Sequence, residues 1–434
     1  MNTVRISYEV PIRACYDVIV AGGGVGGVAA ALSAARHKKK VLLIEKTQKL
    51  GGLATTGLVN LFVPMCNGQG KQIIAGMAEE LLRLSIQYGY DTLAPEWENG
   101  EPQLQDGQPI SRYRTKFSPE IFAMAMTELL RAEGVTMLFD TVVTRPIMTE
   151  NHCDGLLVEN KSGTQYYQGG IIVDATGDAD ILFRAGVPTV QGINYFTYYA
   201  QEITLDSCKK AVESRKINDA IHFAMGGKAN LYGQNHPQGM PFFTGTDAED
   251  INRYLIDGQC ALLDQLKKQD RFSREIITLP GMPQMRTTRH IAGDYVLQEK
   301  DVYRHFEDSV AAVCDFDRTD YLYEIPYRCL INSQYDNLIT VGRTVSAEGY
   351  AWDVARVIPP AIVTGQAAGV AAAMALDQKI ALCAVSVPDL QKTLQKESVM
   401  IHFDDAWIPK DGPTSPYSDD FEIAPRKAGN TDHI

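Results

Sequence analysis

Short, uniformly apolar runs separated by glycine-rich or amphipathic stretches occupy the first and last parts of the chain. The runs 18–21 and 41–44 have the length of strands, and the small-residue stretch between them, which continues to about Arg36, has the composition of a buried helix. Similar runs at 171–173 and 338–341 also lack regular alternation of polar and apolar residues. Continuously apolar strands are typical of parallel sheets that helices cover on both faces. The pattern therefore predicts an α/β fold.

Three glycines mark the turn between the first strand and its helix. Gly22, Gly24 and Gly27 fill the pattern G-x-G-x-x-G. The first glycine permits the tight turn, the second lets a pyrophosphate approach the backbone, and the third lets helix and strand pack closely. Glu45 follows about 20 residues later, where a carboxylate can accept hydrogen bonds from ribose hydroxyls. Together they predict a dinucleotide site with its phosphates at the positive end of the helix. The motif alone does not separate NAD from FAD, and a Rossmann fold without a ligand is the alternative.

Three later segments favour FAD. Residues 50–57 form a second glycine-rich loop, residues 171–177 end in Ala-Thr-Gly, and residues 337–343 end in Gly-Arg. The last segment leads through residues 356–360 into a helix of small residues. In this order the segments resemble the FAD-dependent oxidoreductases of the glutathione-reductase/fumarate-reductase superfamily. The resemblance extends to about residue 395 and is strongest to a bacterial family with D-x-x-V-x-G-G-G near the start and G-R…R-x-x-P…G-Q-A-A-G near the end.

The resemblance implies noncovalent FAD, because no residue is a compelling attachment point. The residues expected to bind the cofactor are Gly22, Gly24, Val25, Gly26, Gly27, Glu45, Lys46, Gly51, Gly52, Leu53, Thr55, Thr56, Val142, Val143, Ala175, Thr176, Gly177, Gly342, Arg343, Ile358 and Pro359. Cys66 lies near the second glycine loop in sequence. A covalent flavin link or a redox role for this thiol is the alternative to an ordinary unpaired cysteine.

The predicted fold class is α/β, with a Rossmann-like FAD-binding domain, consisting of a parallel sheet and a β-meander, plus an inserted α+β substrate domain. Alternating polar and apolar residues near 155–159 and 165–168 predict the meander. The expected boundaries are residues 1–187 and 331–405 for the two parts of the FAD-binding domain, 188–330 for the substrate domain and 406–434 for an irregular C-terminal tail.

Periodicity and turn residues predict several further elements. Ile73, Ile74, Met77, Leu81 and Leu82 recur with nearly helical period. Ser118 and Pro119 have the cap and first-turn identities of a helix that runs to about Glu133. Residues 135–147 are expected to return as a strand. Residues 88–116 are rich in Gly, Pro, Asn, Gln and Asp, which predicts a long surface excursion.

Charge and composition exclude some classes of partner. The net charge of −12 over 434 residues, without a basic patch, argues against nucleic acid. No signal peptide or apolar run of spanning length is apparent, so we expect a cytoplasmic protein without a membrane partner. The eight cysteines lack C-x-x-C or zinc spacing, so we expect reduced thiols and no metal site.

The middle segment contains the candidate catalytic residues. Arg286, Arg289 and His290 are spaced i, i+3 and i+4, so one helical turn would place them on one face. Two guanidiniums and an imidazole can hold a carboxylate or polyhydroxyl substrate and move a proton, with His290 as the candidate base. The alternative is a salt-bridge cluster between domains, with carboxylates such as Asp301 or Asp317 as partners.

Arg356 completes the candidate catalytic set. The resemblance places Arg343 and Arg356 near the flavin or the substrate, and an ion pair at a domain boundary is again the alternative. The family-like stretch that contains Tyr323, Tyr327 and Arg328 has the same two interpretations.

The predicted function is an FAD-dependent oxidoreductase, a dehydrogenase or a reductase, that transfers a hydride between flavin N5 and a small polar substrate. A sugar-derived or carboxylated substrate is favoured by resemblance alone. The expected partners are this substrate and an unidentified electron acceptor or donor, and self-association into a homo-oligomer stays open. The main alternative is a flavin-binding protein or complex subunit in which FAD is structural. An NAD-dependent dehydrogenase is disfavoured by the three flavin-type segments.

Overall fold

A seven-stranded mixed sheet forms the centre of the computed structural model, which describes residues 4, 7–102 and 111–410. The strand order is β5 (Thr136–Leu138), β2 (Val41–Ile44), β1 (Ile12–Ala21), β8 (Gly163–Asp174), β7 (His152–Asn160) and β6 (Val142–Thr149), and β16 (Leu338–Thr340) also pairs with β8. The pairs β2–β5, β1–β2, β1–β8 and β8–β16 are parallel. The meander β6–β7–β8 is antiparallel. The predicted α/β class is confirmed.

Strand β8 joins the two kinds of pairing. Its first residues pair with β7, its later residues pair with β1, and its last three pair with β16. Alternate residues of β1 then face opposite cores. Val18 and Val20 pack on the helical side, whereas Ile19 and Ala21 pack on the side of the meander. Because each apolar face is covered, the strand has no polar side, which explains its continuously apolar sequence.

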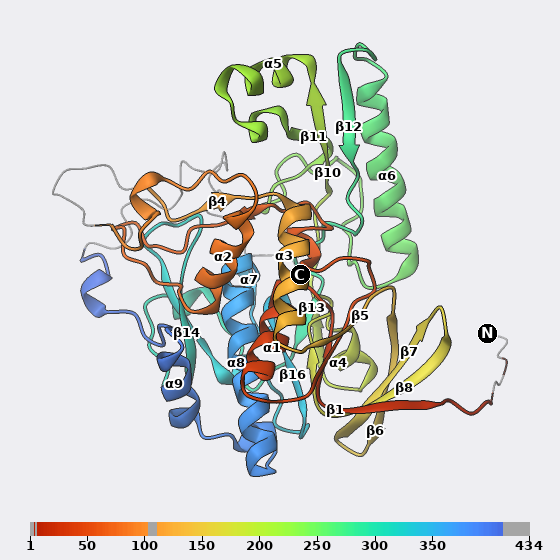
Figure 1. Ribbon diagram of the computed structural model, residues 1–434, viewed down its shortest axis with the longest axis vertical. Helices are drawn as coiled ribbons and strands as arrows, with labels where there is room; N and C mark the ends of the chain where they lie inside the picture. The colour runs from red at the N-terminus through yellow and green to blue at the C-terminus, as the bar shows by residue number, and fades with distance from the viewer. Residues whose placement is uncertain (1–3, 5–6, 103–110, 411–434) are drawn as a thin grey trace.

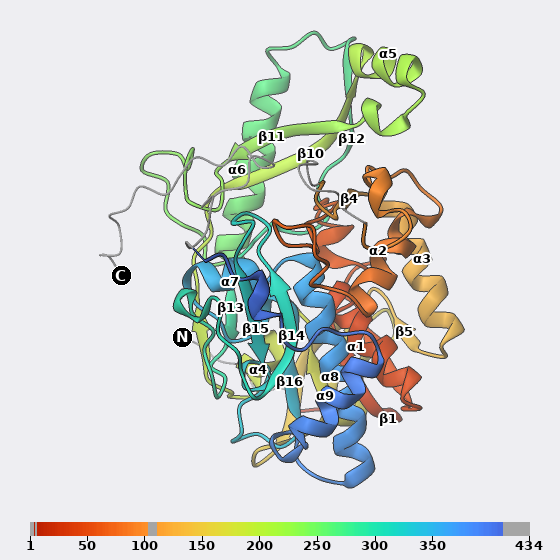
Figure 2. The same cartoon turned by 90° about the vertical axis from the view of Figure 1, so that its left-hand side faces the viewer.

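Helices α1 (Val25–Arg36) and α8 (Ile358–Gln378) lie side by side on the helical face of the sheet (Figures 1 and 2). Glycine allows their close approach, since a β-carbon at Gly365 would lie 2.2 Å from the carbonyl oxygen of Gly26. Helices α2 (Met77–Gln87), α3 (Pro119–Ala132) and α9 (Val387–Lys396) pack around this pair. Within the described chain, α8 alone is long and apolar enough to cross a membrane, but 89% of its most apolar window is buried in the core.

A separate three-stranded sheet stands above the main body in Figures 1 and 2. Its order is β11 (His222–Lys228), β10 (Thr197–Thr204) and β12 (Arg274–Thr278), and helix α6 (Ala248–Leu266) packs on it around a core of its own. The hairpin β14 (Ser309–Cys314) and β15 (Leu322–Pro326) belongs instead to the core on the helical face, where β14 packs against α8 and α9. The segment 188–330 therefore divides among three hydrophobic cores, since Ile291 packs in the core on the meander side of the main sheet.

The remaining elements connect these units. They are β3 (Leu61–Phe62), β4 (Thr115–Lys116), α4 (Asp180–Arg184), β9 (Thr189–Gln191), α5 (Leu205–Ser214), β13 (Arg289–Ile291) and α7 (Gly349–Ala355). Strand β13 pairs with β9, so it joins the start of the middle segment to a later part of the same segment. The predicted tail from residue 406 lies mostly outside the described residues, apart from its first few.

Two predictions of local elements need correction and one is confirmed. The helix predicted from Ile73 begins only at Met77, because Gly76 has a φ of +62° and the amides of Ile73 and Ile74 both donate to Met65. The strand predicted at 135–147 is two strands with a turn at Asp140 between them. The helix predicted after Ser118 is confirmed.

The predicted surface excursion at 88–116 contributes to the core. Trp97 and Tyr113 are fully buried, and their rings stack in parallel with centroids 4.6 Å apart. Trp97 also donates from its indole nitrogen to the carbonyl of Ser111. Polar composition pointed to the loop but not to these two anchors, and residues 103–110 of this stretch lie outside the described residues.

Candidate cofactor site

A cavity of about 350 Å³ opens at one edge of the sheet. At this edge lie the carboxyl ends of the parallel strands β1, β2, β8 and β16. This edge is where open α/β sheets bind their ligands. Most residues predicted to bind FAD line this cavity: Gly22, Gly24, Val25, Gly26, Gly27, Glu45, Lys46, Gly51, Gly52, Leu53, Val142, Val143, Ala175, Thr176, Gly177, Gly342, Arg343 and Ile358. Arg356 lines it as well, whereas Thr55, Thr56 and Pro359 do not.

The three glycines of the motif are needed for different reasons. Gly22 has a φ of +109°, and a β-carbon there would lie 2.3 Å from the carbonyl oxygen of Ala175. A β-carbon at Gly27 would lie 2.0 Å from the carbonyl oxygen of Gly22. At Gly24 a β-carbon would meet no protein atom within 4 Å. Gly22 and Gly27 are thus required by the chain itself, while the space at Gly24 suits a ligand that approaches the backbone.

Glu45 is held in place by backbone amides at the end of β2. Its carboxylate is 6% exposed and accepts hydrogen bonds from the amides of Gly23 at 2.7 Å and Thr47 at 2.8 Å. These bonds connect the acidic residue to the glycine turn. A carboxylate has more acceptor positions than these two bonds use, so it can also accept hydrogen bonds from ribose hydroxyls.

Two helix N-termini open onto the cavity. Gly24 is the N-cap of α1 and Val357 that of α8, and neither cap makes a side-chain hydrogen bond to its helix. Gly24, Val25 and Ile358 line the cavity. The free amides and the positive dipole end of each helix favour a negatively charged group there. The residues present therefore fit a dinucleotide with a pyrophosphate.

The family model that matches this chain is described as "FAD dependent oxidoreductase", and it matches residues 17–256 and 246–394. The chain belongs to this family. It is thus an FAD-dependent oxidoreductase, and the cavity is the candidate site for its FAD. No curated protein matches the chain.

Three of the solved structures with overall similarity to this chain are the following. A geranylgeranyl bacteriochlorophyll reductase-like protein from Thermoplasma acidophilum is 14% identical, with a TM-score of 0.43 over 91% of this chain and 94% of that chain. L-proline dehydrogenase from P. horikoshii is 14% identical, with a TM-score of 0.42 over 90% of this chain and 100% of that chain. A flavoprotein/dehydrogenase from Cytophaga hutchinsonii is 12% identical, with a TM-score of 0.43 over 88% and 84%. Similarity at this level carries no information about the substrate of this oxidoreductase.

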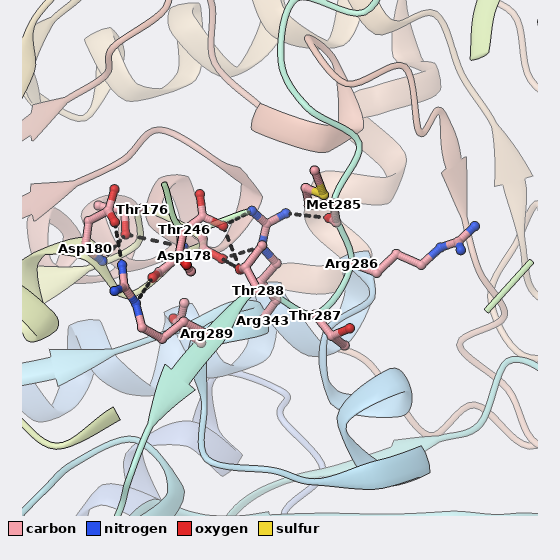
Figure 3. A network of polar contacts seen from close by, with 12 residues as sticks. Thr176, Asp178, Asp180, Thr246, Met285, Arg286, Thr287, Thr288, Arg289 and Arg343 are labelled. Atoms are coloured by element: carbon pink, nitrogen blue, oxygen red, sulfur yellow. Dashed lines mark hydrogen bonds and ion pairs between the residues drawn. The ribbon is translucent and has the colours of Figure 1, made fainter. Parts of the chain in front are cut away.

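One wall of the FAD site is fastened by a network of arginines and aspartates (Figure 3). Arg343 donates to Asp178 Oδ1 at 2.6 Å and to the carbonyl of Met285 at 2.9 Å, and it also bonds the carbonyl of Gly177. Thr288 donates to the same Asp178 oxygen at 2.7 Å. Burial alone would raise the pKa of Asp178, but Arg343 and Thr288 stabilise its anion and hold the pKa below its usual value.

Arg289 belongs to the same network. It donates to Asp180 Oδ1 at 2.8 Å and to the carbonyl of Asp178 at 2.8 Å. The salt-bridge interpretation of this arginine is thus the one that the geometry supports, with Asp180 as partner in place of Asp301 or Asp317. Asp178 and Asp180 directly follow the Ala-Thr-Gly sequence, and this acidic pair was the available signal for the network.

The predicted helical face of Arg286, Arg289 and His290 is wrong. Residues 289–291 form strand β13, so Arg289 and His290 point to opposite sides. His290 is buried edge-to-face against Trp352 with ring centroids 4.6 Å apart, and its Nδ1 lies 2.7 Å from the carbonyl oxygen of Ile291. Burial lowers the pKa of His290. Neither Arg289 nor His290 lines the FAD cavity.

Arg286 extends away from the network in Figure 3. The one hydrogen bond that its guanidinium makes to a described residue is a long contact of 3.5 Å from Nη1 to the carbonyl oxygen of Ala229, and no described carboxylate forms an ion pair with it. Arg356, by contrast, donates from Nε and Nη2 to Asp353 at 2.8 and 2.6 Å. Burial and repulsion by Arg356 lower the pKa of Arg286 to about 10. The geometry thus leaves one guanidinium without an ion-pair partner among the described residues, beside an arginine of the cavity wall and within electrostatic range of Asp353.

The other candidate residues make contacts that hold the fold together. Cys66 is fully buried, accepts a hydrogen bond from the amide of Tyr113 and does not line the FAD cavity. Burial raises the pKa of its thiol. Tyr327 donates to the carbonyl of Leu382, and Arg328 pairs with Asp308. The cavity wall also includes Arg184 and Met282, which no motif indicated.

Proposed function

We propose that this FAD-dependent oxidoreductase transfers a hydride between FAD and a small polar substrate that carries a carboxylate. The observation that supports this proposal is Arg286, a guanidinium without an ion-pair partner among the described residues, next to the arginine that lines the cavity. Arginine binds carboxylates through two parallel hydrogen bonds. A substrate anion would supply the ion-pair partner that Arg286 lacks among the described residues.

The position of the anion follows from Arg356. Two guanidiniums that repel each other define a place where one negative charge relieves the repulsion and restores the ordinary pKa of Arg286. Asp353 already forms an ion pair with Arg356 through two hydrogen bonds. The added anion would therefore form its ion pair mainly with Arg286. We therefore place the substrate carboxylate between Arg286 and the cavity wall near Met282 and Arg356.

The chain's own residues would bind and orient the substrate. FAD supplies the redox chemistry when it is bound. Tyr199 lies close enough to Arg286 for the two side chains to interact electrostatically, and burial raises the pKa of its phenol. A phenol that stays protonated can donate a hydrogen bond to a substrate oxygen. Within the described part of the cavity wall there is no histidine, cysteine or tyrosine, so we leave the proton acceptor unassigned.

The test is anaerobic reduction of the purified yellow protein by a panel of small molecules. The panel pairs each 2-hydroxy acid, amino acid or sugar acid with its uncharged alcohol, amide or polyol analogue, and flavin absorbance reports reduction. The dithionite-reduced protein is mixed in parallel with unsaturated acids and their amides as oxidants. We expect turnover in one direction with an acid and at least tenfold less with its neutral analogue.

Two results would contradict the proposal. Equal rates for acids and neutral analogues would show that the substrate needs no carboxylate, while the redox activity itself would stand. No reduction or reoxidation by any compound, with FAD fully bound, would favour the alternative in which FAD is structural in a larger complex.

A further inference from the structure

Two histidines and a glutamate from three separate segments meet at the β14–β15 hairpin. Glu324 on β15 is fully buried, while His305 precedes β14 and His402 follows α9. His305 Nδ1 lies 2.5 Å from Glu324 Oε1, and His402 Nδ1 lies 3.0 Å from Glu324 Oε2. One ligand atom from each residue lies within 4.8 Å of the other two. None of the three lines the FAD cavity.

We propose that His305, Glu324 and His402 bind one divalent transition-metal ion, with Zn²⁺ as the best match. Two imidazoles and one carboxylate are a ligand set of three-residue zinc sites whose fourth position is held by water. The side chains of His305 and His402 are 39% and 43% exposed, so a fourth position can face solvent. Ca²⁺ and Mg²⁺ prefer oxygen ligands throughout, so two imidazoles disfavour them.

The surroundings of the three residues resemble the outer shell of a metal site. Asp405 Oδ1 lies 3.0 Å from His305 Nε2, on the side of the ring away from Glu324. A histidine that ligates a metal usually donates its other ring N–H to such a carboxylate. The amide of Phe306 donates to Glu324 Oε2 at 2.8 Å and so orients the buried carboxylate. The four side chains thus provide both ligands and support.

The site would fasten the last described segment to the main body. The amide of Ala312 donates to the carbonyl of Met400 at 2.7 Å, and Ser309 donates to the carbonyl of Ile401 at 2.6 Å. A metal ion on His402, Glu324 and His305 would add a third connection at the same edge of the hairpin. Because Zn²⁺ has no redox chemistry, its effect there would be on stability.

The test uses the FAD-loaded full-length protein, treated with chelator and then titrated with ZnCl₂ by calorimetry. We expect one ion per chain, a higher melting temperature and unchanged FAD content. His305→Ala and His402→Ala should each weaken Zn²⁺ binding by at least about 100-fold, whereas Asp405→Asn should weaken it by roughly 10–100-fold, as for outer-shell residues elsewhere. His222→Ala is the matched control, because His222 makes a similar 3.1 Å contact with Glu202 but has no second imidazole.

Absence of stoichiometric Zn²⁺, Co²⁺ or Ni²⁺ binding to the wild-type protein would overturn the proposal. Equal affinity in the wild type and in the His305→Ala/His402→Ala double variant would do so too. If a variant loses FAD or fails to fold, a second measurement on the wild-type protein tests whether the metal site exists. Zn²⁺ should protect His305 and His402, but not His222, from a histidine-modifying reagent as read by mass spectrometry, and equal modification of all three would reject the site.

Discussion

Arg286 and Arg289 are three residues apart and have opposite electrostatic surroundings. Arg289 is 5% exposed and pairs with Asp180, whereas Arg286 has no ion-pair partner among the residues that the structure describes. Removing one partner of a buried ion pair leaves the other charge uncompensated, which lowers stability. Removing a charge that has no partner does not have this effect. The two arginines should therefore respond differently to the same substitution.

We expect Arg286→Met to leave the melting temperature unchanged or higher and to lower turnover of an acidic substrate. Loss of a hydrogen-bonded charge contact costs about 1.5–3 kcal/mol, which corresponds to roughly 10–150-fold in KM. Arg289→Met should instead lower the free energy of unfolding by about 1–3 kcal/mol, with little change in KM. Urea unfolding and steady-state kinetics measure the two effects. The reverse pattern would assign the substrate contact to Arg289.

Gly24 offers a test of the cofactor site itself. Its φ of −62° and ψ of 169° are allowed for any residue, and a β-carbon there meets no protein atom. Gly24→Val should therefore abolish FAD retention while the apoprotein stays within about 1 kcal/mol of wild-type stability, the usual range for a change at a helix N-cap. Gly27→Val is the matched control and should unfold the turn, since its β-carbon would collide with Gly22. Full FAD content in Gly24→Val would place the pyrophosphate elsewhere.

The candidate site was predictable at the residues whose role is local. The glycine turn and Glu45 follow from rules that operate within some 25 residues, and the structure brings them to one cavity. The spacing of Arg286, Arg289 and His290 alone predicts one helical face. The actual strand β13 arises because it pairs with β9, about a hundred residues earlier. The spacing of residues within β13 does not show that this segment pairs with β9. It also does not show that Arg286 has no ion-pair partner among the described residues or that Asp180 is the partner of Arg289.

At the scale of elements, α1 and α8 pack closely because glycines without side chains lie where the two helices cross. A β-carbon at Gly365 would lie 2.2 Å from the Gly26 carbonyl oxygen and 2.9 Å from the β-carbon of Ala29. In a helix interior, Gly→Ala normally stabilises by roughly 0.5–1 kcal/mol. Here we expect Gly365→Ala to destabilise by about 1–3 kcal/mol, because overpacking must push the helices apart. Urea unfolding measures the sign directly. A gain in stability would mean that the two helices separate freely at this crossing.

The elements themselves were predictable where one signal dominates. The helix after Ser118 and the meander match their patterns, since helix-start residues and an alternation are local signals, although the Ser118 side chain makes no capping hydrogen bond. The helix at Met77 was predicted too early because Ile73 and Ile74 are apolar for another reason: they are buried beside Met65 in a turn. Hydrophobic spacing reports burial, and burial alone does not distinguish a helix from the loop before it.

At the scale of the whole molecule, the candidate FAD site joins distant parts of the chain. Its wall combines the first βαβ unit, the start of β6, the turn after β8, Met282 from the middle segment and the start of α8. A ligand that contacts all of these segments binds the folded chain and not the unfolded one. Bound FAD should therefore stabilise the protein by an amount that grows with its free concentration, about 2.7 kcal/mol at 100 times Kd.

The last prediction is that this FAD is bound without a covalent link. A covalent link needs a nucleophilic side chain at the flavin, and no cysteine, histidine or tyrosine is among the described residues of the cavity wall. Cys66 is the nearest sequence candidate, but it is fully buried and hydrogen-bonded to Tyr113, and burial raises the pKa of its thiol, which disfavours the reactive thiolate. Acid precipitation of the yellow protein should thus release FAD into the supernatant, with Cys66→Ala behaving like the wild type. Yellow colour retained in the precipitate of the wild type and lost in Cys66→Ala would show that the thiol reaches the flavin after all.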